Sequence, residues 1–310
     1  MASNIYLNKQ SLAKRVWKFR YMYLFILPAI VFYLIFSYYP MYGVVIAFKN
    51  YRYDLGILGS PWAGFKYFKQ VFSYSYIWNI LRNTVVISLL KLFVGFPMPI
   101  LLALMLNEVR NKPFKKTIQT ISYLPYFVSW VVVVTLMSKF FSPHMGLVNQ
   151  IRAALFNAEP IFYFGSKTHF YPLIVFSDIW KSVGWGSIIY LAALTAINPE
   201  LTEAAVIDGA NRLRLTWHIT LPSIRPTIGI LFILSLGNLL KAGFEQIYLM
   251  QTPAVISIAE ILETYTLKEG LFRGNYSYST ALGLLTSLVG FVLIITANSL
   301  SKKYTEVALW

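Results

Sequence analysis

The chain has 310 residues, of which 57% are hydrophobic, 17% are aromatic and only 13% are charged. Soluble globular domains average about 45–50% apolar and about 25% charged residues, so this composition excludes an ordinary water-soluble domain. The net charge of +15 arises from 27 Lys and Arg residues against 12 Asp and Glu residues, spread over short loops. Such a spread favours a membrane protein over one that binds nucleic acid. With no cysteine, the chain has no disulfide, thiol nucleophile or cysteine metal site.

Apolar runs of about twenty residues recur along the chain, and each can cross a hydrocarbon core of about 30 Å as a helix. We therefore predict an all-α integral membrane protein with a single transmembrane domain over residues 21–300. Its six helices are expected at residues 21–40, 83–106, 118–137, 170–197, 226–240 and 280–300.

Basic residues gather on one side of this arrangement. They lie in the amino-terminal segment 1–20, in the loop 110–116 and in the tail 301–310. The positive-inside rule places that side in the cytoplasm, so both termini are expected there.

The segment 198–222, between the fourth and fifth spans, is too long and too patterned for a simple turn. Asn198 is expected to cap a short helix, with Pro199 at its first position and Glu200 in the first turn. Gly209 is expected to stop that helix in a left-handed conformation. A second short helix is expected over 210–218, ended by Pro222.

This segment also reads Glu-Ala-Ala, three residues, Gly, nine residues and Ile-x-Leu-Pro. It resembles the signature of membrane subunits of binding-protein-dependent ABC importers, which implies a type I importer permease with a MetI-like core. The resemblance also implies that the first short helix is a cytoplasmic coupling helix that docks into a separate ATPase subunit. The expected coupling residues are Glu203, Ala204, Ala205, Asp208, Gly209, Ile219, Leu221 and Pro222. The alternative is a surface hairpin without a partner.

The resemblance implies a set of partners in the bacterial cytoplasmic membrane. These are a second homologous permease subunit, two copies of the ATPase and an extracytoplasmic solute-binding protein. The chain has no Gly-x4-Gly-Lys-Ser/Thr sequence, so ATP and magnesium are expected on the ATPase and no cofactor on this chain. The three histidines have no metal-ligand spacing, so no metal site is expected. The chain is expected to be a transport subunit and not an enzyme.

Landmarks outside the loop resemble the carbohydrate branch of this family, and among its members the importers of oligosaccharides and polysaccharide fragments. They are Asn83-Thr84, Leu124-Pro125-Tyr126, Asp178-x-Trp180, Asn238, the run from Ser37 to Gly43 and the run from Gly274 to Ser277. An importer of another solute, such as an amino acid or phosphate, is the first alternative. A membrane enzyme or scaffold that recruits a soluble protein through segment 198–222 is the second.

Resemblance to the larger membrane subunit of the maltose importer implies a sugar pocket. The matching positions are Tyr126, Asp178, Ser182, Trp185 and Asn238. Three of them hold other residues than in that subunit, so the identity of the sugar does not transfer.

Helical spacing selects the same region independently of the resemblance. Asp178, Lys181, Ser182 and Trp185 are spaced i, i+3, i+4 and i+7, which is one stripe of a helix. Two interpretations stay open: Asp178 and Lys181 only neutralise each other, or they bind sugar together with stacked aromatic rings, with Lys181 contacting an acidic sugar. Lys91 and Arg82, in the second span, are expected to have structural roles.

Overall fold

The structure, a computed structural model, describes residues 17–305. Most of the predicted amino-terminal segment 1–20 and the end of the predicted tail 301–310 lie outside this range. Within it, regular structure is helical apart from one isolated bridge between Lys49 and Trp62. The predicted all-α class is therefore confirmed for the described part of the chain.

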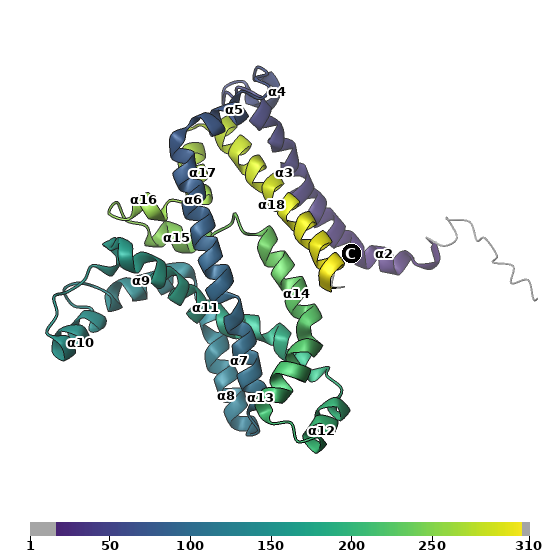
Figure 1. Ribbon diagram of the computed structural model, residues 1–310. Helices are drawn as coiled ribbons and strands as arrows, with labels where there is room; N and C mark the ends of the chain where they lie inside the picture. Colours follow the sequence, from purple (N-terminus) through teal and green to yellow (C-terminus); the bar gives the residue numbers. More distant parts are fainter. Residues whose placement is uncertain (1–16, 306–310) are drawn as a thin grey trace, which may run out of the picture.

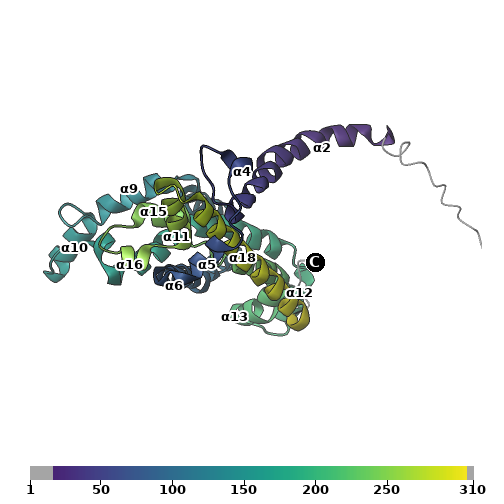
Figure 2. The same cartoon turned by 90° about the horizontal axis from the view of Figure 1, so that it is seen from above.

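The first span is one helical run from Arg20 to Phe48, longer than the predicted 21–40. It consists of α2 (Arg20–Tyr33), η1 (Leu34–Tyr38), α3 (Tyr39–Met41) and η2 (Tyr42–Phe48). Figure 1 shows α2 leading away from the other helices, whereas its continuation lies beside α18 (Tyr276–Thr305), and the view from above in Figure 2 agrees. The most apolar part of this run is unburied within the chain, so lipid or another subunit must cover it.

The second span runs from Ser75 to Glu108 through α6 (Ser75–Leu90), η3 (Lys91–Gly95) and α7 (Pro97–Glu108). The η3 segment is a single π-helical turn that begins at Lys91. Such turns often occur at functional sites, and this one faces a cavity described below.

The third predicted span, 118–137, is not one straight helix. The helical stretch Lys112–Phe127, made of α8 (Lys112–Tyr123) and η4 (Leu124–Phe127), meets α9 (Trp130–Phe140) at an angle of 101°. Ser129 caps the new helix by accepting a hydrogen bond from the Val132 amide at 3.4 Å. An apolar run does not reveal such a break, because hydropathy carries no information about the direction of the chain.

The fourth helix, α11 (Lys167–Thr195), is the central element of the structure. Its buried residues recur every three or four positions along its length, and it packs against α7, α8, η4 and α14. At Gly184 the fit is so close that an added Cβ would lie 2.0 Å from the Ser122 carbonyl oxygen of α8. Small residues allow such close approach of membrane helices.

The segment after α11 confirms the expected caps but not the expected end. In α12 (Pro199–Ile207), Asn198 accepts a hydrogen bond from the Glu200 amide, and Gly209 follows with φ +79°. From Arg212 to Gly237, however, the chain is one helical run through α13 (Arg212–Leu215), η6 (Thr216–Thr220) and α14 (Leu221–Gly237).

Pro222 therefore does not end a helix, and the fifth span begins well before residue 226. The Leu221 amide bonds to the carbonyl of Thr216, five residues back, in the wide turn of η6. Placed directly after this turn, Pro222 occupies the first turn of α14, where a missing N–H is tolerated.

The remaining elements are α4 (Gly56–Gly59), α5 (Lys66–Ser73), α10 (Leu147–Phe156), η5 (Tyr163–Gly165), α15 (Phe244–Met250), α16 (Ile256–Ala259), α17 (Leu262–Leu267) and η7 (Lys268–Phe272). Those that are labelled in Figure 1 lie away from α12 and α13, with α4, α5 and α17 toward its upper end and α10, α15 and α16 at its left side.

Among the described residues, four helical runs are long and apolar enough to cross a membrane, and the bent pair is a fifth if counted as one span. The four are Arg20–Phe48, Ser75–Glu108, Arg212–Gly237 and Tyr276–Lys303. The 29-residue helix α11 is long enough to cross but is not among them, and it carries Asp178 and Lys181. The count of six stays a prediction.

We expect Gly184→Ala to destabilise the protein by about 1–3 kcal/mol, because the new methyl group meets backbone of α8 that cannot rotate away. Thermal unfolding of the purified protein in detergent measures this. Gly283→Ala is the matched control, since Gly283 is also helical but a Cβ there meets nothing within 4 Å. Equal melting temperatures for the two variants would contradict the close contact.

Candidate functional site

A cavity of about 450 Å³ lies between the second helical run, α11 and α14. Its volume falls within the range of about 300–1,000 Å³ that is typical of small-molecule sites. The polar side chains that line it include Ser88, Lys91, Asp178, Ser182, Asn238 and Lys241. Three of the predicted sugar-pocket residues, Asp178, Ser182 and Asn238, are therefore brought together.

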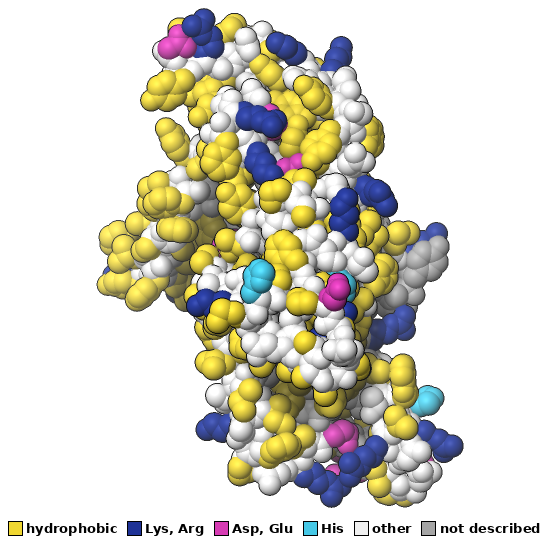
Figure 3. Space-filling model, turned by 90° about the vertical axis from the view of Figure 1, so that its left-hand side faces the viewer, with side chains coloured by type: hydrophobic (Ala, Val, Ile, Leu, Met, Phe, Trp, Pro, Cys, Tyr) yellow, Lys and Arg dark blue, Asp and Glu magenta, His cyan; other side chains and the backbone are white. Residues whose placement is uncertain are grey.

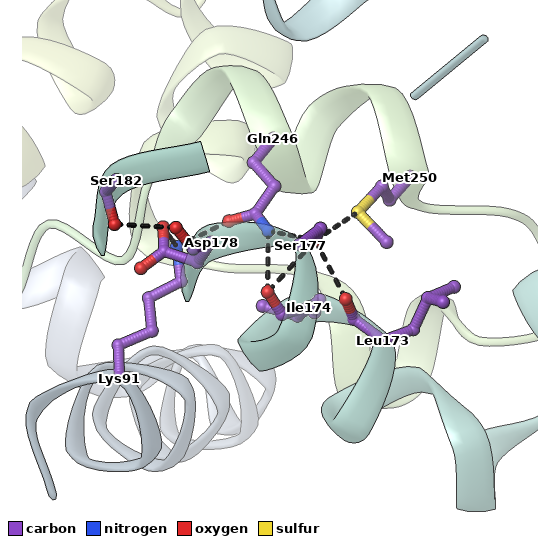
Figure 4. A network of polar contacts seen from close by, with 8 residues as sticks. All are labelled: Lys91, Leu173, Ile174, Ser177, Asp178, Ser182, Gln246 and Met250. Carbon is purple, nitrogen blue, oxygen red and sulfur yellow. Dashed lines mark hydrogen bonds and ion pairs between the residues drawn. The ribbon is translucent and has the colours of Figure 1, made fainter. Parts of the chain in front are cut away.

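Asp178 does not pair with Lys181, which contradicts the interpretation that these two residues only neutralise each other. Its carboxylate lies 3.1 Å from Lys91 Nζ, which comes from the second helical run. Figure 4 shows Lys91 reaching across to Asp178 and to Gln246. Helical spacing identifies neighbours on one helix but not the partner that a second helix brings closer.

Gln246 of α15 fixes the position of the Lys91 ammonium. This side chain is almost completely buried, and its Nε2 donates to the Ile174 carbonyl and to Ser177 Oγ, both at 2.8 Å. Its Oε1 is left to accept from Lys91 Nζ at 2.5 Å (Figure 4). Sequence reasoning missed Gln246, because a single polar residue in the seven-residue helix α15 carries no periodic signal.

Lys181 instead donates hydrogen bonds to the backbone at the break between η4 and α9. Its Nζ donates to the carbonyl oxygens of Tyr126 at 2.7 Å, Val128 at 2.6 Å and Pro125 at 3.5 Å. These contacts occupy the ammonium group, and Lys181 does not line the cavity. The structure therefore gives no support to a contact between Lys181 and an acidic sugar.

The predicted aromatic platform forms a stack of two rings. Tyr126 and Trp185 lie with their centroids 4.6 Å apart and their planes 5° from parallel, and Phe127 meets Trp185 edge-on. Both stacked rings stay partly exposed, at 41% and 43%. Because each ring covers one face of the other, a sugar can stack only on an outer face.

The predicted coupling residues lie between the C-terminal end of α11 and the start of α14. In α12, Glu203, Ala204 and the C-terminal residue Ile207 are exposed, Ile207 at 86%. Figure 3 shows Lys and Arg side chains beside carboxylates at this lower end of the molecule, where Figure 1 places α8, α12 and α13. Of the remaining coupling residues, Asp208, Gly209 and Pro222 are exposed and Ala205, Ile219 and Leu221 are half-buried.

α12 joins the two walls of the cavity. It follows directly on α11 and is connected through Gly209 to the continuous run that contains α14. Both of these helices line the cavity. Only residues 196–198 separate α12 from α11, and residues 208–211 separate it from α13.

We expect Lys181→Met to lower the melting temperature of the protein, because it leaves carbonyl groups of the break without a donor in apolar surroundings. A lost hydrogen bond to a charged group costs about 1.5–3 kcal/mol. Lys139→Met, at an exposed position in α9, is the control and should shift stability by about 0.5 kcal/mol or less. Partial rescue by Lys181→Arg is also expected; loss no greater than in the control would contradict this role.

Comparison with known proteins yields one family and several close relatives. Residues 95–306 match the family described as binding-protein-dependent transport system inner membrane component. The polygalacturonan/rhamnogalacturonan transport system permease protein YteP of Bacillus subtilis (strain 168) is 46% identical over 291 residues, which are 94% of this chain and 90% of that protein.

Two crystal structures are also similar to this chain. The first is a bacterial ABC transporter involved in the import of the acidic polysaccharide alginate, with a TM-score of 0.88 and 39% identity over 96% of this chain and 100% of that chain. The second is a bacterial alginate ABC transporter in complex with an alginate pentasaccharide-bound periplasmic protein, with a TM-score of 0.88 and 38% identity over 97% of this chain and 100% of that chain.

Proposed function

Because this chain belongs to the family of inner membrane components of binding-protein-dependent transport systems, we propose that it is the permease subunit of an ATP-driven importer of oligosaccharides or polysaccharide fragments. The transported class follows from the relatives, whose names specify polygalacturonan, rhamnogalacturonan and alginate. The chain is a transport subunit of six membrane-spanning helices with both termini in the cytoplasm, and ATP is hydrolysed on a separate ATPase.

The connection of α12 to both cavity walls carries this proposal. An ATPase that grips α12 through Glu203 and the small residues Ala204 and Ala205 changes the distance between α11 and α14 when it closes. Cytoplasmic docking of this kind explains why α12 exposes Leu201, Val206 and Ile207 as well as charged groups. The cavity then opens alternately to the two sides of the membrane.

The remaining partners follow from the same architecture. One chain offers one coupling helix, so a second homologous permease and two ATPase copies complete the assembly. A solute-binding protein delivers the saccharide, as the similar alginate transporter is seen with a saccharide-loaded periplasmic protein. Asp178, Ser182 and Asn238 contact the sugar hydroxyls in the cavity, and Tyr126 and Trp185 offer an outer ring face at its margin.

Replacing Gly209 tests the coupling. Gly209→Val forces a β-branched residue into a left-handed conformation and changes the angle between α12 and α13. We expect ATP-dependent saccharide uptake in proteoliposomes that contain the full complex to fall about tenfold, which corresponds to about 1.4 kcal/mol of coupling free energy. Basal ATP hydrolysis should continue without stimulation by the loaded binding protein.

Gly56→Val is the matched control for strain. Gly56 also has positive φ, +63°, and open space around its Cα, but it lies far from α12. Equal losses in both variants would show that strain alone lowers uptake. ATP-dependent uptake of an amino acid or phosphate in place of saccharide would favour the alternative importer, and turnover of a substrate without the ATPase would favour a membrane enzyme.

A further inference from the structure

The Lys91 ammonium lies in the wall of the cavity under conditions unusual for a membrane helix. Its side chain is only 15% exposed, and Asp178 and Gln246 hold it from two other elements. A Cβ at Gly243, the residue just before α15, would lie 2.7 Å from Lys91 Nζ, so the chain leaves room for the ammonium on a third side. Inserting an ionisable group into the bilayer costs about 2.5–3.5 kcal/mol on insertion scales. A lysine held in this way at a cavity is therefore a candidate for a functional role.

Ser88 gives a second, independent observation in the same wall. It lies one helical turn before Lys91, so the two side chains are on one face. Ser88 is only 7% exposed. Its Oγ is one of four buried side-chain oxygens without a hydrogen-bond partner among residues 17–305. Of the four residues that carry these oxygens, Ser88 is the one that lines the cavity. A buried hydroxyl without a partner is costly unless a ligand or water satisfies it.

The charges of the cavity favour an anionic ligand. Its lining contains the ammonium groups of Lys91 and Lys241 and the carboxylate of Asp178. One further carboxylate brings this set to neutrality. Lys241 also lines a neighbouring cavity with Glu263. Burial is the largest influence on the pKa of Glu263 and raises it, whereas hydrogen bonds from the Gly243 and Ala242 amides and the charges of Lys241 and Lys91 lower it.

We propose that Ser88 and Lys91 form a carboxylate subsite that makes this chain selective for acidic saccharides, and that Asp178 occupies Lys91 until the substrate carboxylate replaces it. This inference rests on the proposed function and specifies its substrate as a uronate-containing saccharide. Lys91 donates to the uronate carboxylate as a charge-assisted hydrogen bond, and the Ser88 hydroxyl donates to its second oxygen. Asp178, 28% exposed toward the cavity, is then free to accept from sugar hydroxyls.

The test compares trigalacturonate with its carboxyl-reduced, neutral counterpart of the same length. ATP-dependent uptake of each is measured in proteoliposomes with the complete complex. Equilibrium binding of each to the detergent-solubilised complex without binding protein is measured as well, so that the selectivity of the binding protein does not mask that of the permease. The readout is the ratio of acidic to neutral saccharide.

Lys91→Met should lower this ratio about tenfold in both measurements, and Ser88→Ala should lower it several-fold. Asp178→Asn should raise it, because Lys91 then has no competing carboxylate. Lys181→Met is the matched control: the same change on α11, at an ammonium bound to backbone carbonyls, should affect both saccharides in the same proportion.

A structural ion pair gives a different pattern. In that case Lys91→Met and Asp178→Asn each lower the uptake and binding of both saccharides equally, and the double variant restores them. This result would overturn the subsite while leaving the importer function intact. Uptake of neither saccharide by the unmodified complex would overturn the proposed function together with the subsite.

Discussion

In so apolar a chain, every charge and every freed backbone carbonyl inside the helix bundle must find its partner within the protein. At the break between η4 and α9 the helix direction changes by 101°. Without Lys181, the carbonyls of Tyr126 and Val128 at this break would lack its hydrogen bonds. Lys181 supplies those hydrogen bonds, and its own charge is stabilised by the same carbonyls and by the faces of Tyr126 and Trp130. A broken helix and a charged residue, each unfavourable alone in lipid, are compatible because they satisfy each other.

The same constraint shapes the end of the molecule away from α12. Glu260, 5% exposed, accepts from Lys268 at 2.6 Å and from Tyr76 at 2.5 Å. Glu269, equally buried, accepts from Arg273 and from Asn275. Each buried carboxylate thus has two donors, as buried charges require. These contacts connect the end of α16 to η7 and to α6, and connect η7 to the residues just before α18.

Much of the fold could be predicted from the sequence because it depends on local chemistry. Apolar runs located the helices, and the caps at Asn198 and Gly209 follow from backbone geometry that few other residues satisfy. The bend after Phe127 and the helix through Pro222 could not be predicted in this way. Both depend on contacts or wide turns that hydropathy does not encode, namely the lysine of α11 in one case and the π-turn of η6 in the other.

In the candidate site, too, some features could be predicted from local sequence patterns and others depend on how the helices pack. The stripe of α11 identified Asp178 and Ser182 as cavity residues, since helical periodicity determines which residues share a face. The partner of Asp178 is Lys91, 87 positions earlier, and the residue that orients Lys91 lies in α15. Such pairings are set by how helices pack, so a sequence shows the candidates for a polar network but not its connections.

The packing also indicates where the cavity can change its shape. α11 is joined to α7 by its most extensive contact, to α8 through Gly184 and to η4 through Lys181. α14, the other wall, packs more against α18 than against α11. Tightly packed blocks shift as units rather than deform. The cavity lies between α11 and α14, and α12 is connected to both helices, so we expect a movement of α12 to change the spacing of the two cavity walls.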